Sequence, residues 1–305
     1  MTKNQKKTNS KPLLQSAFSR REFLGKSVIA TTGISLSGLY SCFSGSTKRN
    51  DLRVIAYNVY KCAGWPADKV TEKSQIPDLL AQELAQYEPD IINFSESPDE
   101  ETVKKIAKQL GMNYAWFPSA GNWPGAILTR FEIIDSANVP IINGNRPDDL
   151  FTRHWGKATL RRHSGEVIVT HSVHLFPFDN QESREIRWRE ISKILDSAEE
   201  DINDNKSVLV IGDLNHTPEM PEYTEWINAG WVDTFAKVGK GEGFTIRADE
   251  PGKRIDYILA HGPITNKISE SRPLFEGAFR TDPSNPDSFA LSDHLPQYAV
   301  FESGD

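Results

Sequence analysis

Cysteine is scarce in this chain of 305 residues, which has Cys42 and Cys62 and no others. Cys42 falls in an N-terminal segment that is expected to be removed or lipidated, which would leave Cys62 without an intramolecular partner. A fold built on a disulfide framework is therefore excluded. Long apolar runs are also missing. The stretch from Val28 to Leu39 is too short and too rich in Gly, Ser and Thr for a membrane-spanning helix, which needs about 20 apolar residues.

Three common catalytic motifs are absent as well. The sequence has no His-x-x-x-His or clustered Cys/His pattern, so a zinc site of the usual kind is not indicated. It also lacks a Gly-rich loop ending in Lys-Ser/Thr, which would hold nucleotide phosphates. No Gly-x-Ser-x-Gly segment stands between an expected strand and an expected helix, so a serine nucleophile of that type is not indicated either.

The two signs of charge are unevenly distributed. The whole chain has 35 Lys and Arg against 42 Asp and Glu, yet residues 1–49 hold nine of the basic residues and a single acid, Glu22. The remainder is therefore strongly acidic and would repel polyanions. Long nucleic acid is for that reason a less favoured substrate than a small molecule.

The first fifty residues are arranged like a targeting signal. Ser19-Arg20-Arg21-Glu22-Phe23-Leu24 precedes the weakly apolar stretch, as in twin-arginine export signals. Leu39-Tyr40-Ser41-Cys42 resembles a lipoprotein processing site with Cys42 acylated, but Tyr40 is bulkier than usual there, so ordinary signal cleavage stays open. We expect residues 1–50 to be export signal and linker. The mature protein is then periplasmic, secreted or lipid-anchored to the outer face of a membrane.

From Asp51 onward, short β-branched runs alternate with amphipathic segments, with no internal repeat and no change in composition. We therefore expect residues 51–305 to form one α/β domain with mixed sheets, antiparallel where a tight turn such as Ser164-Gly165 joins two strands. Expected strands are Leu52–Asn58, Asp90–Phe94, Ala126–Thr129, Ile133–Val139, Lys157–Arg162, Glu166–Val173, Val208–Ile211, a short one near Val232, Arg254–Leu259, Ile268–Pro273 and Gln297–Phe301. Expected helices are Ile76–Tyr87, Pro98–Leu110 and Gln181–Glu200.

Polar side chains stand at the ends of several expected strands. Gly212 allows the chain to leave the sheet sharply, and Asp213 and Asn215, two residues apart, can then project to the same side. Asn58 and Glu96 follow two other buried strands. Each alone would be typical of a loop, but convergent strand ends are where α/β proteins place their sites. A carboxylate beside an amide suits a metal-phosphate site, because one holds charge and the other donates to a phosphoryl oxygen.

Asp256 and His294 are the candidates for activating water. Asp256 lies in the alternating segment Arg254-Ile255-Asp256-Tyr257, and His294 follows Asp293 near the C-terminus. A carboxylate that accepts from an imidazole fixes its tautomer and raises its basicity. A neutral imidazole beside a metal-bound phosphate can then take a proton from the attacking water. We therefore expect Asp256 to orient His294.

Two further histidines lie near the end of the strand Glu166–Val173. His174 is the last residue before the turn at Pro177, and it is the candidate for donating to the phosphate or to the leaving oxygen. Alternation along the strand sends His171 to the opposite face, so a structural role is expected for it.

The order of these motifs resembles that of the endonuclease/exonuclease/phosphatase superfamily, which includes pancreatic-type deoxyribonuclease, apurinic endonucleases, neutral sphingomyelinases and inositol-polyphosphate phosphatases. The resemblance spans residues 52–301. It implies a four-layer sandwich, in which two mixed, largely antiparallel sheets pack together with helices outside. The matching positions are Asn58, Glu96, Gly125–Arg130, His174, Gly212-Asp213-Leu214-Asn215, Arg254-Ile255-Asp256-Tyr257 and Ser292-Asp293-His294.

The resemblance also implies a chemistry and a set of roles. The reaction would be in-line displacement by water without a covalent enzyme intermediate, supported by one or two divalent cations, usually Mg²⁺, with Mn²⁺ or Ca²⁺ as alternatives. The residues implied to surround the metal and its phosphate are Glu96, as principal ligand, Asn58, Asp213 and Asp293. Those implied to hold the phosphoryl group are Asn215 and His174, and those implied to activate water are Asp256 and His294.

The substrate stays open at this point. The inositol-phosphatase signature, a Trp-Cys before Asp-Arg, is missing, Leu214 stands where an aromatic is commoner, and no position matches a deoxyribonuclease disulfide. The acidic domain favours a small organic phosphate or a phospholipid headgroup, and a secreted or surface nuclease acting on DNA or RNA is the alternative. A surface-binding lipoprotein without activity is disfavoured, because no expected ligand or base position is lost. A monomer is expected, and packing is the expected role of Trp65, Trp116, Trp123 and Trp155.

Overall fold

The computed structural model describes residues 50–140 and 149–303. The chain from Asn50 onward forms one compact unit. The Arg20-Arg21 pair and Cys42 lie outside the described residues. Within the described ranges, no helix combines the length and the apolar character that crossing a membrane requires.

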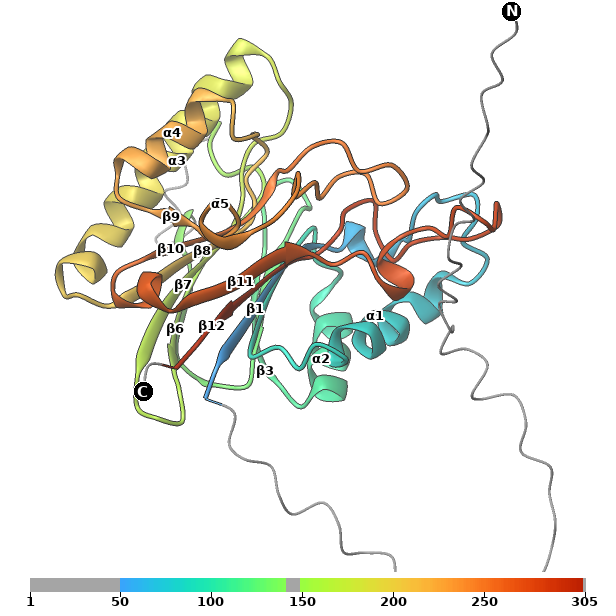
Figure 1. Ribbon diagram of the computed structural model, residues 1–305, viewed down its shortest axis with the longest axis horizontal. Coiled ribbons are helices and arrows are strands. Elements are labelled where there is room, and N and C mark those ends of the chain that lie inside the picture. Colours follow the sequence, from blue (N-terminus) through green and yellow to red (C-terminus); the bar gives the residue numbers. More distant parts are fainter. Residues whose placement is uncertain (1–49, 141–148, 304–305) are drawn as a thin grey trace, which may run out of the picture. The chain divides into compact units, whose positions relative to one another are not determined.

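Two six-stranded sheets form the centre of this unit (Figure 1). Each contains one parallel pair, β1 with β2 and β7 with β8, and all other neighbours are antiparallel. In spatial order the first sheet consists of β11 (Ile268–Pro273), β12 (Gln297–Phe301), β1 (Leu52–Asn58), β2 (Ile91–Ser95), β4 (Gly125–Thr129) and β3 (Asn113–Phe117). The second consists of β5 (Glu132–Asn138), β6 (Trp155–Arg161), β7 (Val167–His174), β8 (Ser207–Asp213), β10 (Asp256–His261) and β9 (Val232–Asp233).

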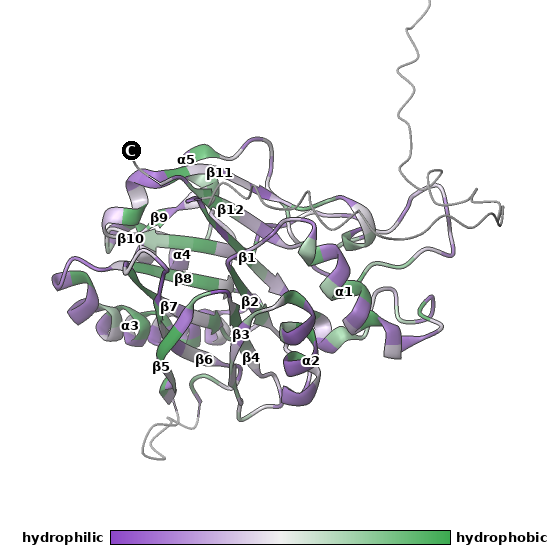
Figure 2. Ribbon diagram, turned by 90° about the horizontal axis from the view of Figure 1, so that it is seen from below, coloured by the Kyte–Doolittle hydropathy of each residue, from purple (hydrophilic) through white to green (hydrophobic). Residues whose placement is uncertain are grey.

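Side-chain alternation explains why the two sheets pack together and why each has helices on its other face. In β1, Val54 and Ala56 join the core between the sheets, whereas Ile55 and Tyr57 join the core under the first pair of helices. In β8, Leu209 faces the core between the sheets and Val210 faces the opposite helices. Figure 2 colours β8 and β10 as strongly hydrophobic, as expected for strands that are buried on both faces.

The helices complete a four-layer sandwich. On the first sheet lie α1 (Ile76–Ala85) and α2 (Glu100–Leu110), and on the second lie α3 (Gln181–Asn203) and α4 (Pro221–Asn228) (Figure 1). Asp99 caps α2 by accepting from the Thr102 amide at 3.0 Å. The expectation of two mixed, largely antiparallel sheets with helices outside is confirmed.

Among the α-helices and strands of the described residues, three escaped the sequence-based prediction. These are β3, α4 and the five-residue helix α5 (Thr234–Val238). The two helices are too short to show a clear 3.6-residue period. The strand expected from Arg254 begins at Asp256, since Arg254 precedes the ladder and pairs with Asp233 at 2.6 Å. Cys62 is a buried free thiol.

Candidate active site

The polar residues expected at strand ends come together where the parallel pairs of the two sheets end. Asn58 is the last residue of β1, Glu96 follows β2, and His174 and Asp213 close β7 and β8. Asn58 Nδ2 donates to Asp213 Oδ2 at 3.0 Å and so joins one sheet to the other. Both side chains are buried.

Asp213 lies at the centre of the cluster. Its Oδ2 atom is 3.6 Å from His174 Nε2 and 3.8 Å from His294 Nε2, and its Oδ1 atom accepts from the Asn215 amide at 3.0 Å. Burial and the nearby Asp256 carboxylate raise the pKa of Asp213 to about 7. A carboxylate held in this way would gain from a cation that restores its charged form.

Gly212 brings β7 and β8 close enough for this contact. A Cβ atom at this position, where φ is +147°, would lie 1.8 Å from the Val173 carbonyl oxygen. Glycine is therefore required by the close approach of the two strands, which is what puts His174 and Asp213 side by side.

Asp256 and His294 form the expected hydrogen-bonded pair, with 2.8 Å between Asp256 Oδ2 and His294 Nδ1. The His294 amide donates to Ser292 Oγ at 3.2 Å, and Ser292 Oγ donates to the Asn58 carbonyl at 2.7 Å. Although burial lowers the pKa of His294, the charges of Asp256 and of the neighbouring aspartates raise it to about 10. His294 Nε2 is left facing Asp213 and the rest of the cluster.

Glu96 is held in an unusual setting directly after β2. Its φ is +47°, and its carbonyl oxygen accepts from the Lys61 amide at 2.7 Å. The Oε2 atom is buried and has no hydrogen-bond partner. Burial raises the pKa of Glu96, and a hydrogen bond from Asn58 opposes that rise. An unpartnered buried carboxylate oxygen is costly, so this site suits a cation.

The donor set fits a hard divalent cation. Ligand atoms of Asp213, Asp256 and His294 lie within 4.8 Å of one another. Because Asp256 already occupies His294 Nδ1 at 2.8 Å, we interpret Asp256 and His294 as a hydrogen-bonded pair, with Asp213 3.8 Å from His294 Nε2. Glu96, with its unpartnered Oε2 atom, and Asp213 then offer the carboxylate oxygens that hard cations prefer, and the half-buried Asp293 is the third ligand that the sequence led us to expect.

Two other predicted residues lie at the edge of this cluster. Asn215, at φ +52°, donates from Nδ2 to the Leu175 carbonyl at 3.0 Å, so one of its two amide hydrogens is already used. Asp293 Oδ1 lies 3.3 Å from Ser292 Oγ, and the Asp293 carbonyl accepts from the Ala248 amide at 2.7 Å. His171 lies elsewhere: its Nδ1 accepts from Trp155 Nε1 at 3.1 Å in the buried core, as a structural role requires.

Sequence reasoning missed two basic residues beside the cluster. Lys61 Nζ lies 4.0 Å from the centroid of the Trp123 ring, and the Arg153 guanidinium lies 4.4 Å from the same centroid. A signal for Arg153 was present, because it shortly precedes β6, and the start of β6 lies at the edge where the antiparallel β7 ends. Lys61 carries no comparable signal in the sequence.

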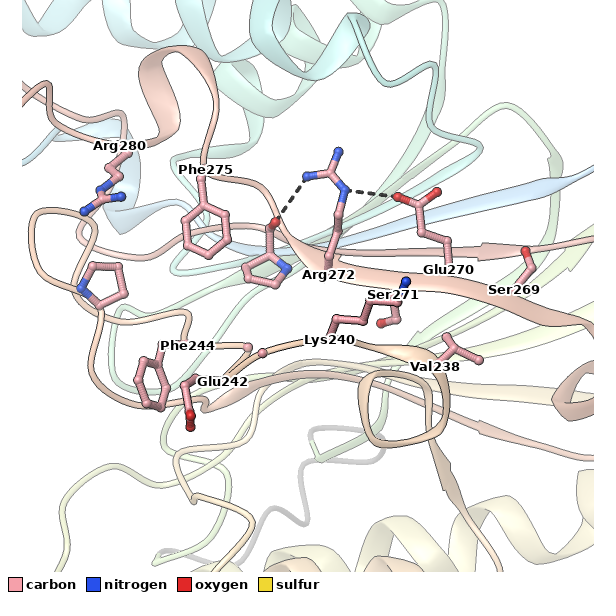
Figure 3. Close-up of a pocket in the computed structure, with 14 residues that line it drawn as sticks. Val238, Lys240, Glu242, Phe244, Ser269, Glu270, Ser271, Arg272, Phe275 and Arg280 are labelled. Carbon is pink, nitrogen blue, oxygen red and sulfur yellow. Dashed lines mark hydrogen bonds and ion pairs between the residues drawn. The ribbon is translucent and has the colours of Figure 1, made fainter. Parts of the chain in front are cut away.

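The cavity drawn in Figure 3, of about 640 Å³, is lined by none of the predicted site residues. It lies between β11 and the segment from Val238 to Pro251, with Phe244 and Phe275 among its apolar walls. The Arg272 guanidinium in its wall donates to Glu270 at 3.0 Å, which offsets its charge. The cavity is therefore separate from the strand-end cluster, whose residues do not line it.

A known protein family and several solved structures match this chain. The model of the Endonuclease/Exonuclease/phosphatase family matches residues 55–294. No curated protein sequence matches the chain.

Similar solved structures cover most of the described chain. A family protein from Bacteroides thetaiotaomicron superposes with a TM-score of 0.66 at 17% identity, covering 83% of this chain and 95% of the other. A mannosyl-6-phosphatase from the same species gives a TM-score of 0.66 at 17% identity, covering 81% and 98%. Truncated TDP2 from Caenorhabditis elegans gives 0.60 at 19% identity, covering 83% and 98%. At such identities these likenesses concern the fold.

Proposed function

Because the chain belongs to the endonuclease/exonuclease/phosphatase family, whose members are hydrolases acting on phosphoester bonds, we propose that it hydrolyses a phosphodiester or phosphomonoester with the help of Mg²⁺ or a similar divalent cation. The observation that supports this most is the meeting of the Asp256–His294 pair with Asp213 beside the unpartnered Oε2 atom of Glu96. An unpartnered carboxylate oxygen, an imidazole held by a carboxylate and polar donors such as His174 and Asn215 are the parts that phosphate-ester hydrolysis needs.

In this proposal each residue of the cluster has one task. A divalent cation held by Glu96, Asp213 and Asp293 would supply Lewis-acid stabilisation of the charge that develops on the phosphoryl oxygens. Asn58 keeps Asp213 in place through its 3.0 Å hydrogen bond. His174 and the remaining amide hydrogen of Asn215 donate to the phosphoryl group or to the leaving oxygen.

His294 takes the proton from the attacking water at Nε2, while Asp256 holds Nδ1 in the protonated tautomer. The pKa of His294, raised to about 10 by the surrounding carboxylates, would keep the ring protonated at neutral pH. The hold of these carboxylates on the proton weakens once their charge is shared with a cation. His294 thus becomes a usable base in the state in which substrate reacts.

The acidic composition of the domain supports a small organic phosphate or a phospholipid headgroup as substrate, and the alternative is a nuclease acting on DNA or RNA. A mannosyl-6-phosphatase is among the proteins of this fold, and a fold does not fix the substrate, so both classes of substrate stay open. We further propose that Arg20-Arg21 direct export by the twin-arginine route and that Cys42 carries a lipid anchor. We also propose that the protein acts as a monomer, because one chain supplies every residue of the cluster.

A substrate screen tests the proposal directly. Purified protein is assayed with Mg²⁺, and separately with EDTA, against DNA, RNA, sphingomyelin, inositol phosphates and sugar phosphates. We expect turnover of at least one class that requires the cation and is lost in His294→Ala, while the exposed His163→Ala serves as the matched control. Equal turnover with EDTA, or an unaffected His294→Ala variant, would contradict the proposal.

A further inference from the structure

Lys61 and Arg153 are two cations on one aromatic ring beside the proposed active site. The Trp123 ring centroid is 4.0 Å from Lys61 Nζ and 4.4 Å from the Arg153 guanidinium carbon. Neither cation forms an ion pair within residues 50–140 and 149–303, whereas Arg162, Arg187 and Arg254 do. Neither charge is therefore neutralised by an ion pair within these ranges, and both cations are attracted to the face of the same ring.

Backbone contacts fix the three loops that carry these side chains. The Lys61 amide donates to the Glu96 carbonyl at 2.7 Å, which puts Lys61 next to the proposed metal ligand. The Gly121 amide donates to the Thr152 carbonyl at 3.0 Å, and a Cβ on Gly121 would lie 2.6 Å from that oxygen. The loop of Trp123 therefore contacts the loop of Arg153 closely. Lys61 itself has φ +53°, a left-handed conformation that persists only where the surroundings enforce it.

Arg153 also interacts electrostatically with the cluster. Glu96 and Asp213 attract its charge, and burial opposes that charge and lowers the pKa of Arg153 from its ordinary value. Its Nε atom is buried and has no hydrogen-bond partner. A half-buried guanidinium with an unused donor, within electrostatic reach of the carboxylates that would hold the metal, can donate to an oxygen of a bound phosphate.

The negative charge on the substrate determines how much these two cations contribute to its binding. A phosphomonoester carries close to two negative charges at neutral pH, since its second pKa is about 6, and it has three non-bridging oxygens. A phosphodiester carries one charge, and its second ester group replaces one of those oxygens. Hydrogen bonds to charged groups contribute about 1.5–3 kcal/mol each, so losing one changes affinity by roughly tenfold or more.

We propose that the unit formed by Lys61, Trp123 and Arg153 binds the additional anionic oxygen of a phosphomonoester, so that the site selects monoesters over diesters. This inference rests on the proposed phosphoesterase function and narrows its substrate class. Arg153 and Lys61 are then the residues that determine specificity, and Trp123 is a positioning residue that keeps both cations at the site.

Two chromogenic probes with the same leaving group separate the classes. p-Nitrophenyl phosphate is the monoester and bis(p-nitrophenyl) phosphate the diester, and both are assayed with Mg²⁺. We expect kcat/KM for the monoester to fall about tenfold more than that for the diester in Arg153→Gln and in Lys61→Gln. Lys108→Gln, which removes an exposed charge on α2, should leave the ratio unchanged. Trp123→Leu should also lower the ratio of kcat/KM for the monoester to kcat/KM for the diester. Combining Trp123→Leu with Arg153→Gln should lower this ratio little further than Arg153→Gln alone.

Binding provides a readout that does not need turnover. Titration calorimetry with inorganic phosphate and with dimethyl phosphate, in Mg²⁺ and again in EDTA, should show that Arg153→Gln weakens phosphate binding about tenfold and dimethyl phosphate binding little. Equal losses for both ligands, or a wild-type protein that prefers the diester, would overturn the inference. If neither probe is hydrolysed, the result counts against the proposed function. The binding comparison would then still show whether Arg153 favours the monoester.

Discussion

Glu96 is the residue whose surroundings are hardest to explain without a cation. Its Oε2 atom is buried without a hydrogen-bond partner, and burial raises the pKa of its carboxyl. Left-handed backbone at Glu96, Lys61 and Asn215 adds local strain beside the cluster. Strain and unsatisfied polar atoms of this kind concentrate where a protein binds or reacts.

Glu96→Gln tests this directly. The substitution keeps the shape of the side chain but removes the charge that a hard cation needs, so activity should fall by orders of magnitude. The melting temperature without metal should stay the same or rise, because a buried charge is removed, and the rise on adding Mg²⁺ should shrink. Near wild-type turnover in saturating Mg²⁺ would remove Glu96 from the site.

The Asp256–His294 pair makes a second prediction at this scale. Because Asp256 holds His294 at 2.8 Å, Asp256→Asn should cause much of the loss of activity seen in His294→Ala. The double variant should be little worse than His294→Ala alone, as expected for residues that act as a unit. Steady-state kinetics of the four proteins measure the coupling, and independent, additive losses would show that the two residues do not cooperate.

Sequence reasoning located residues at strand ends better than residues in loops. Asn58 and Asp213 end buried strands, one in each sheet, and the ends of such strands are where α/β proteins place their sites. Lys61, Trp123 and Arg153 come from three separate loops, and their meeting depends on single contacts such as that of Gly121 with Thr152. No local pattern encodes such a contact between distant loops.

At the scale of elements, alternation along the strands predicted most of the sheets. Hydrophobic runs such as Val208–Ile211 are buried on both faces, and their length marks them as strands. The strand β3 was missed because its exposed and buried residues mix polar and aromatic types at a sheet edge. Short helices such as α4 gain their stability from packing, here through the buried Arg187–Glu222 pair to α3 at 2.7 Å.

The helix α3 anchors two loops beside the site through Glu190. Its carboxylate accepts from the Phe151 amide at 2.6 Å and from the Phe176 amide at 2.8 Å. Burial raises the pKa of Glu190 to about 7, so the folded state binds a proton more tightly than the unfolded chain does. The contribution of this group to stability is therefore full below its unfolded pKa of about 4.3 and is lost as pH rises through about 7.

Urea unfolding of Glu190→Gln between pH 4.5 and 8 measures this effect. Relative to the variant, the wild-type protein should lose unfolding free energy as pH rises through this window, by about 1.4 kcal/mol for each unit of pKa shift. Buried histidines such as His171, whose pKa is lowered to about 3, act in the opposite direction in both proteins and cancel in the difference. The exposed Glu199→Gln is the control. Parallel profiles for wild type and Glu190→Gln would refute the role of Glu190.

At the scale of the whole molecule, a basic N-terminal segment precedes a domain of acidic composition. The twin-arginine pattern predicts that Arg20→Lys with Arg21→Lys leaves the precursor in the cytoplasm, which fractionation and immunoblotting would show.

Cys42→Ser should release the exported protein from membranes without loss of activity, because acyl chains supply about 0.8 kcal/mol of membrane-binding free energy per buried CH₂. If the Cys42→Ser protein still sediments with membranes, a direct contact between protein and lipid must replace the anchor.

The central claim is that water, activated at His294, attacks phosphorus in a reaction that depends on a divalent cation. Hydrolysis of a phosphate-ester probe in ¹⁸O-enriched water tests it most directly, with mass spectrometry of both products. We predict that, with Mg²⁺ present, ¹⁸O enters the phosphate product and is absent from the released alcohol. Label in the alcohol, or hydrolysis that proceeds unchanged in EDTA, would contradict the claim.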